Sequence, residues 1–339
     1  MILNRAELIR NGSGTQGRKA RRLLVETLDH TLASVDPCKL VSRHVRRQGD
    51  RLVVDGEITR LGEYDSVFLV GAGKASGAMA EALEEILGRR LDDGLVVIPI
   101  GQTRPRLKRV TPLLAPHPTP DYNSVNAARE LVGLVERMTN RDLLICVISG
   151  GGSALLSLPT EPVTIEDKGQ TARMLMNAGA TIVELNTVRK HLSAVKGGWL
   201  AKRSGAGRIL GLAISDVVGD GPDSIASGPI SPDPTTFSDA IAILKKYNLS
   251  HSIPDVAAKI LRDGAEGTVA ETPKGDDSCF RKVRYHIVGS SRDACTSAQK
   301  YLRSKRITAK VLSSSVTGEA RYLGSFIGSL ARQIATSDE

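Results

Sequence analysis

Short apolar runs alternate along the chain with segments in which apolar residues recur at helical spacing. The runs over 67–70, 94–100 and 143–148 predict strands, and helical patterns over 79–87 and 124–138 separate them. The third run is continuous rather than alternating, as in a strand that is buried on both faces. This βαβ series predicts an α/β fold with a mainly parallel, Rossmann-like sheet and helices on both faces.

The same pattern places further elements along the chain. Thr164 can cap a helix that ends near Gly179, and Thr181 with Glu184 forms a capping-box pattern at the start of the next helix. A polar, glycine-rich stretch over 264–278 is typical of an exposed loop. The other predicted elements are helices over 17–40, 186–202, 292–302 and 319–334 and strands over 209–214, 285–289 and 309–312.

These elements divide the chain into parts. We predict an N-terminal Rossmann-like domain over 1–255, a linker or loop over 256–282 and the start of a second α/β domain over 283–339. A length of 339 residues fits two domains of the usual ~100–200 residues, or one large α/β unit.

The composition is that of an ordinary folded protein. Hydrophobic residues make up 41% of the chain and charged residues 24%, which excludes a mainly disordered protein. Aromatic residues reach only 3%, so an aliphatic core of helices on a parallel sheet is favoured over a β-sandwich. No apolar run approaches the ~20 residues of a membrane span, and we predict no membrane association. We predict a cytoplasmic location for two reasons. The four cysteines are widely spaced without a C-x-x-C pair, and the N-terminus lacks an apolar signal core.

The charge balance is basic. Lysine and arginine total 46 against 37 aspartate and glutamate residues, a net charge of +9. Such a balance favours anionic partners, and solubility alone explains it equally well. Part of the excess lies near the N-terminus, where no nucleic-acid-binding motif accompanies it, so we predict no specific nucleic acid partner. These basic residues are Arg18, Lys19, Arg21, Arg22, Arg43, Arg46 and Arg47.

A glycine-rich segment follows the first predicted strand and precedes a helix. Gly71 and Gly73 allow a sharp turn with close approach to a ligand, and Lys74 adds a positive charge beside the helix N-terminus. The segment lacks the spacing of a Walker A loop, and Ser76 stands where G-x-G-x-x-G has its third glycine. An anion-binding loop and a tight βα turn with a solvated lysine are both open.

A second glycine-rich loop follows the run over 143–148. Three consecutive glycines flanked by serines are better explained by close approach of the backbone to phosphate than by a flexible loop. A serine nucleophile is disfavoured because the G-x-S-x-G elbow is absent. The residues of this candidate loop are Ser149, Gly150, Gly151, Gly152 and Ser153.

The predicted helix over 186–202 carries polar residues on one face. Arg189 and Lys196 are seven residues apart on a neighbouring stripe, where they can direct two positive charges at phosphate. A solvated face is the alternative, although glycine, hydroxyl and amide residues are poor choices for it. The residues of the polar face are Asn186, Lys190, Ser193 and Gly197.

Two carboxylates follow the strand predicted over 209–214. Asp216 and Asp220 are placed to bind Mg²⁺ together with substrate oxygens, since Mg²⁺ takes one or two carboxylates in such sites. Either could instead act on a hydroxyl as a base, and an Asp-Gly turn is the structural alternative. The loops over 117–121 and 225–229 are candidate walls of the same cleft.

The order and spacing of six motifs resemble those of the glycerate 2-kinase family, some members of which are labelled hydroxypyruvate reductases. The motifs are GAGKASGAM, HPTPD, ISGGGSALL, LNTVRKHLSAVKGG, ISDVVGD and IASGPI. The resemblance implies ATP- and Mg²⁺-dependent phosphorylation of the 2-hydroxyl of D-glycerate, in a cleft between two α/β domains. It places the family's catalytic lysine at Lys74, and we take Asp216 and Lys190 as further catalytic candidates.

The resemblance also gives roles to the remaining motif residues. Asp216 and Asp220 are the candidate metal ligands. The candidate ATP-binding residues are Gly71, Gly73, Ser149, Gly150, Gly151, Gly152, Ser153, Asn186, Arg189 and Lys196.

The chain departs from the family at two places. Trp199 stands where members usually have arginine, and members continue past the position of Glu339 into a segment with a G-G-R-N-type motif. We therefore expect the second domain to be incomplete, with exposed apolar helix residues such as Leu323, Phe326 and Leu330. Three explanations of an incomplete domain stay open. The chain is a fragment, a separate polypeptide supplies the segment, or activity has been lost. An NAD(P)H-dependent hydroxypyruvate reductase, an inactive nucleotide-binding subunit and a homo-oligomer also stay open.

Overall fold

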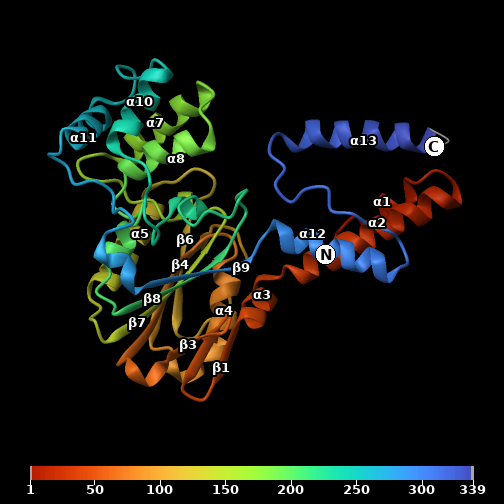
Figure 1. Cartoon of the computed structure of the whole chain (residues 1–339), viewed down its shortest axis with the longest axis horizontal. Helices are drawn as coiled ribbons and strands as arrows, with labels where there is room; N and C mark the ends of the chain where they lie inside the picture. Colours follow the sequence, from red (N-terminus) through yellow and green to blue (C-terminus); the bar gives the residue numbers. More distant parts are fainter. Residues whose placement is uncertain (1, 337–339) are drawn as a thin grey trace.

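The computed structural model, which describes residues 2–336, is built around a six-stranded parallel sheet (Figure 1). In spatial order the strands are β6 (Val110–Ala115), β5 (Asp93–Pro99), β4 (Ser66–Ala72), β7 (Asp142–Ser149), β8 (Arg208–Ile214) and β9 (Val283–Gly289). Every neighbouring pair is parallel. The chain builds outward from β4 to β6 and then returns to place β7 on the other side of β4. The point where the strand order reverses therefore lies between β4 and β7, the usual position of a ligand crevice in such sheets.

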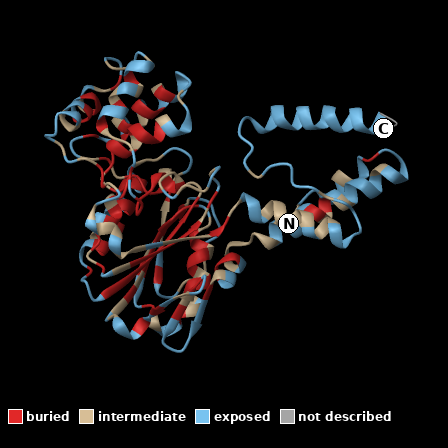
Figure 2. Cartoon of the chain, in the orientation of Figure 1, coloured by how far each residue is buried: buried red, intermediate tan, exposed pale blue. Residues whose placement is uncertain are grey.

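Both faces of the sheet are covered, which confirms the predicted α/β class. Successive side chains of a strand point to opposite faces, so β7 buries Leu144 and Cys146 on one side and Leu143 and Ile145 on the other. The first side packs against α5 (Tyr122–Glu136), α6 (Gly152–Leu155) and α9 (Trp199–Arg203). The second packs against α3 (Pro37–His44) and α4 (Ser76–Leu87). Figure 2 shows the buried residues concentrated along the strands and the inner faces of these helices.

A separate helical lobe stands at the carboxyl ends of the strands (Figure 1). It consists of α7 (Ile165–Asn177), α8 (Ile182–His191), α10 (Phe237–Lys246) and α11 (Asp255–Ala265), which share one apolar core. Thr164 and Thr181 cap α7 and α8 through capping boxes, as the sequence predicts. Thr236 caps α10 in the same way.

The prediction of one continuous helix over 186–202 is wrong. Helix α8 ends at His191, and the chain turns through Gly197 and Gly198, which have φ of 57° and 88°, before α9 begins at Trp199. The expected single face of Asn186, Lys190, Ser193 and Gly197 therefore does not exist beyond Lys190. The chain turns because Ser193 leaves the helix to bridge Pro159, and the amides of Gly197 and Gly198 donate hydrogen bonds to Ser227 and Gly228.

Other differences lie outside the central βαβ series. A small antiparallel sheet of β1 (Val45–Gln48), β2 (Arg51–Val54) and β3 (Glu57–Arg60), and strand β6, were not predicted. The strand expected over 309–312 is irregular chain, and the helix expected over 17–40 is divided between α2 (Gly14–Ser34) and α3. Short 3₁₀ helices cover Leu61–Glu63, Gly88–Arg90, Ile225–Ser227 and Ser278–Lys282.

The part of the chain predicted as a second domain contributes to the same sheet. Strand β9 pairs with β8, and the segment predicted as linker begins with helix α11. Beyond β9, α12 (Ser291–Ser304) packs beside α2, where the rings of His30 and Tyr301 stack with centroids 4.6 Å apart. The short helix α1 (Arg5–Arg10) also contacts α2. The predicted domain boundaries themselves stay a prediction.

Helix α13 (Ala320–Thr336) stands away from the sheet, and all its residues are exposed (Figures 1 and 2). The predicted exposure of Leu323, Phe326 and Leu330 is confirmed, since they are 37%, 64% and 44% exposed. Within residues 2–336, no helix combines the length and the apolar character that a membrane span needs.

Candidate functional site

Two loops meet at the reversal of strand order, one after β4 and one after β7. The backbone amide of Lys74 donates a hydrogen bond to the carbonyl of Gly150 at 2.9 Å. The amide of Ala75 donates to Oγ of Ser149, also at 2.9 Å. The two glycine-rich loops that the sequence singled out separately are therefore joined into one surface, because parallel strands end at the same edge of the sheet.

Close packing between these loops requires glycine at Gly73. Gly73 has φ of 142°, and a Cβ there would lie 2.1 Å from Oγ and 2.6 Å from the carbonyl oxygen of Ser149. A Cβ at Gly150 would lie 2.0 Å from a carboxylate oxygen of Asp216. The contact with the backbone of Ser149 means that packing of the loops already explains Gly73 before any ligand is considered, whereas the exposed Asp216 side chain could move away from a Cβ at Gly150.

We expect Gly73→Ala to destabilise the protein and displace the Ser149 loop. The clash with a backbone carbonyl cannot be relieved by a rotamer change, so the free energy of unfolding should fall by about 2–4 kcal/mol. Urea unfolding of the two chains measures this difference. Gly101→Ala is the matched control, because Gly101 has φ of 84° but no atom within 4 Å of its missing Cβ. An equal loss in both variants would mean that backbone conformation alone, not the loop contact, requires glycine at Gly73.

Three ionisable side chains gather around the second loop. A Cβ at Gly151 would lie 3.0 Å from the ring of His117 and 3.3 Å from Cγ of Lys74, while Asp216 covers Gly150. All three side chains are exposed. Within residues 2–336, neither the Lys74 ammonium nor the Asp216 carboxylate forms a side-chain hydrogen bond or ion pair. These charges are therefore available to a ligand.

The residues present fit a magnesium ion that is held mainly by the ligand. No group of three or more histidine, cysteine, aspartate and glutamate residues in the described part of the chain could hold a metal by itself. Mg²⁺ needs only one or two carboxylates when phosphate oxygens supply the rest, and Asp216 presents a free carboxylate of this kind. Asp220 lies further along the same loop, and no contact among the described residues joins its carboxylate to Asp216.

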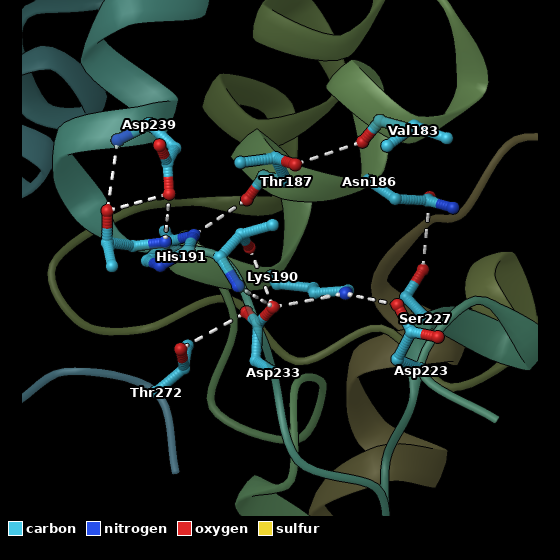
Figure 3. Close-up of polar contacts among 12 residues, drawn as sticks. Val183, Asn186, Thr187, Lys190, His191, Asp223, Ser227, Asp233, Asp239 and Thr272 are labelled. Atoms are coloured by element: carbon cyan, nitrogen blue, oxygen red, sulfur yellow. Dashed lines mark hydrogen bonds and ion pairs between the residues drawn. The ribbon is translucent and has the colours of Figure 1, made fainter. Parts of the chain in front are cut away.

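Lys190 occupies a different environment from the one predicted for a catalytic lysine (Figure 3). Its ammonium is buried between two carboxylates, 3.2 Å from Asp233 and 3.6 Å from Asp223. Burial alone would raise the pKa of Asp233, but the charge of Lys190 and hydrogen bonds from Thr235 outweigh it and lower the pKa. Thr272 also donates to Asp233 at 3.1 Å. The pair joins α8 to the loop before α10.

Asn186 and Ser153 are joined through Ser227, which lies in the loop over 225–229 that the sequence indicated as a candidate cleft wall. Ser227 lies 2.7 Å from Oγ of Ser153 and donates a hydrogen bond to the side-chain oxygen of Asn186 at 3.2 Å. Figure 3 shows Asn186 and Ser227 facing one another. The chain of contacts ties α8 to the Ser149–Ser153 loop. No repeated spacing in the sequence could reveal it, because the three residues come from three separate segments.

Two cations from the α8 region face a small cavity. Arg189 and Lys196 line it together with Ser153, and it also receives Lys168 and Arg173 from α7. Burial, with a contribution from Arg189, lowers the pKa of Lys196 to about 7. Burial also lowers the pKa of Lys168 well below its ordinary value, and Lys196 and Arg189 add to this. Lys168 was not predicted from the sequence, although its place in a buried stripe with Ile165, Ala172 and Leu175 is an unusual one for lysine.

The remaining site predictions are placed as follows. Gly71 lies one residue before the end of β4, against Val147 of β7, and Gly152 begins α6 against Ala226. Trp199 is half-buried at the start of α9, with the ammonium of Lys202 5.9 Å from its ring centre. The structure thus brings the two glycine-rich loops, Lys74 and Asp216 together, and places Lys190 in a separate ion-pair cluster.

Comparison with known proteins finds matches over most of the chain. The family model "Domain of unknown function (DUF4147)" matches residues 23–262. The glycerate 2-kinase of Pyrococcus horikoshii is 36% identical over 93% of this chain and 70% of its own length. A putative hydroxypyruvate reductase of Agrobacterium vitis is 37% identical over 92% of this chain and 66% of its own length. The crystal structure of a Thermotoga maritima glycerate kinase superposes with a TM-score of 0.76 at 32% identity, covering 95% of this chain and 71% of that one. The chain thus spans about two thirds of the length of these relatives.

Proposed function

Because the chain belongs to the glycerate 2-kinase family, we propose that it transfers a phosphoryl group from ATP to the 2-hydroxyl of D-glycerate, with 2-phosphoglycerate and ADP as products. The observation that carries the proposal is the meeting of two glycine-rich loops at the reversal of strand order, beside the unpaired charges of Lys74 and Asp216. An amine and a carboxylate at such a crevice suit phosphates and their counter-ion.

Phosphoryl transfer needs positioning and charge stabilisation more than covalent chemistry from the protein. We assign Lys74 to stabilise negative charge on the transferring group, since its side chain is exposed beside the point where the strand order reverses. The backbone of Ser149–Ser153, with Gly71 and Gly73, would lie along the phosphates. Asp216 and Asp220 would hold Mg²⁺, which would supply charge neutralisation for the phosphates.

The helical lobe supplies the other proposed contacts. Arg189 and Lys196 would direct positive charge at the anionic ligands, and Asn186 would set the Ser149–Ser153 loop through Ser227. We propose that Lys190 acts as a positioning residue, since both its carboxylate partners are protein groups. A role in contact with substrate would require those ion pairs to open.

We also propose a reducing compartment and a second polypeptide. All four cysteines are free, as expected for the cytoplasm. The exposed apolar side chains of α13 support a partner polypeptide that covers this helix. A second copy of this chain is the other candidate for the same surface.

Phosphorus NMR of the purified chain with D-glycerate, ATP and Mg²⁺ tests the activity. We expect a growing 2-phosphoglycerate signal with matching ADP and no requirement for a nicotinamide. The measurement is repeated with a polypeptide that carries the G-G-R-N-type segment added in trans. Oxidation of NADH by hydroxypyruvate, with no phosphorylated product in either sample, would favour the reductase instead. Tight binding of ATP without turnover in either sample would favour an inactive nucleotide-binding subunit.

A further inference from the structure

The cavity between α7 and the loop after α8 contains an uncompensated cluster of positive charge. The ammonium of Lys168 is inaccessible to solvent and has no hydrogen-bond partner, although it carries three donors. Lys196 is 1% exposed, and its ammonium donates to the carbonyl of Leu156 at 2.7 Å. Leaving a buried ammonium without a partner is costly, so this cluster calls for a compensating group.

Among the residues that the structure describes, no carboxylate forms an ion pair with Lys168, Arg189 or Lys196. None of the residues that line the cavity is acidic; besides the cations they include hydroxyl residues such as Ser153, Ser157 and Thr119. The nearest acidic residues in the sequence of α7 are engaged elsewhere. Asp167 caps the helix through Thr164, and Glu166 accepts a hydrogen bond from Tyr122.

The cavity admits one small group. Its volume is about 90 Å³, enough for one phosphate or carboxylate group and too small for a nucleoside. Arg173 lies at its exposed side, with its guanidinium 3.4 Å from where a Cβ of Gly169 would be. Positive groups therefore face the space from α7, from α8 and from the segment after α8, while hydroxyls complete the wall.

We infer that Lys168, Arg189 and Lys196 form a binding site for a compact oxyanion, a single carboxylate or phosphate group, with Arg173 at its entrance. Charge-assisted hydrogen bonds to an oxyanion would satisfy the donors that the protein leaves open. Burial and the neighbouring cations lower the pKa values of Lys168 and Lys196, and a bound oxyanion would raise both.

The position of the cavity connects this site to the proposed reaction. Ser153 belongs to both the cavity wall and the second glycine-rich loop. Resting on the proposed function, the inference makes this cluster the subsite for the carboxylate of D-glycerate or for a phosphate of ATP. Both sources share the same chemistry.

Thermal unfolding at low ionic strength tests the site with inorganic phosphate as the probe. Lys168→Met keeps the aliphatic stem and removes the charge, so the ligand-free variant should unfold at a higher temperature than the parent. Its affinity for phosphate should fall at least about tenfold. Lys245→Met, on the exposed face of α10, is the control and should retain the parental response. Because Arg173 is exposed, Arg173→Met tests the same site without disturbing the core and should weaken phosphate binding severalfold.

Two further titrations identify the source of the anion. If protection by D-glycerate is lost in Lys168→Met while protection by MgATP remains, the site takes the carboxylate. The opposite result assigns it to a phosphate of the nucleotide. Phosphate affinities of Lys168→Met and Arg173→Met within twofold of the control would overturn the inference, as would a parental chain that does not respond to phosphate. These measurements need no turnover, so an inactive chain that binds phosphate through Lys168 would contradict the proposed kinase reaction and leave the anion site standing.

Discussion

Lys74→Met lowers the rate of phosphoryl transfer by about 10²–10³-fold, the loss expected when one preorganised charge is removed from a transition state. Methionine keeps the length of the side chain and removes only the ammonium. The backbone hydrogen bonds of Lys74 with Gly150 and Gln102 do not involve the ammonium and should persist. The expected change is therefore in turnover, with little change in the free energy of unfolding.

Turnover and nucleotide affinity separate this role from simple binding. We expect kcat to fall by the full factor, while the dissociation constant of MgATP changes by less than about tenfold, because only transition-state stabilisation accelerates the reaction. Lys108→Met, an exposed lysine outside the crevice, should leave both values unchanged. A rise in KM by the same factor, with kcat unchanged, would contradict the catalytic assignment. Lys74 would then be a contact of the ground state.

Asp233→Ala costs about 3–5 kcal/mol of stability, because it leaves the buried ammonium of Lys190 with a single, half-buried carboxylate partner. Asp233 is 1% exposed and also accepts hydrogen bonds from Thr235 and Thr272 (Figure 3). Urea unfolding at neutral pH measures the loss. In the double variant Asp233→Leu with Lys190→Met, both charges are gone, so most of the stability should return.

The contribution of Asp233 to the free energy of unfolding should decrease as the pH falls. Its pKa is lower in the folded protein than its ordinary value, because Lys190 and the Thr235 hydrogen bonds outweigh the effect of burial. Its contribution is therefore present above the ordinary carboxyl pKa and is lost as pH falls through the lowered value. The difference in stability between parent and Asp233→Ala should shrink in acid. A difference that is independent of pH would mean that packing, not charge, is lost in the variant.

Much of the sheet could be predicted because its strands are buried on both faces. Continuous apolar runs in β4, β5 and β7 distinguish them from their surroundings without knowledge of their partners. Strand β6 escaped prediction because it contains Pro112 and lies at the edge, where half-burial weakens the pattern. The helix caps at Thr164 and Thr181 were predictable for a similar reason, since a capping box lies within four consecutive residues.

The helix over 186–202 shows where spacing misleads. Polar residues at helical intervals continue past His191, but contacts with Pro159, Ser227 and Gly228 turn the chain there. These partners lie more than 25 residues away, so local spacing contains no information about them. The same limit applies to Lys190, whose carboxylate partners Asp223 and Asp233 come from a distant loop.

The sequence by itself determined the α/β class, the two glycine-rich loops and the resemblance to glycerate 2-kinases, because each depends on residues that are neighbours along the chain. Only the tertiary structure decided which charges are free. Lys74 and Asp216 are left unpaired beside the joined loops, Lys190 is neutralised by carboxylates, and Lys168 is buried without a counter-charge. The free energy of a charge depends on burial and on the groups within a few ångströms, and folding alone brings those groups together.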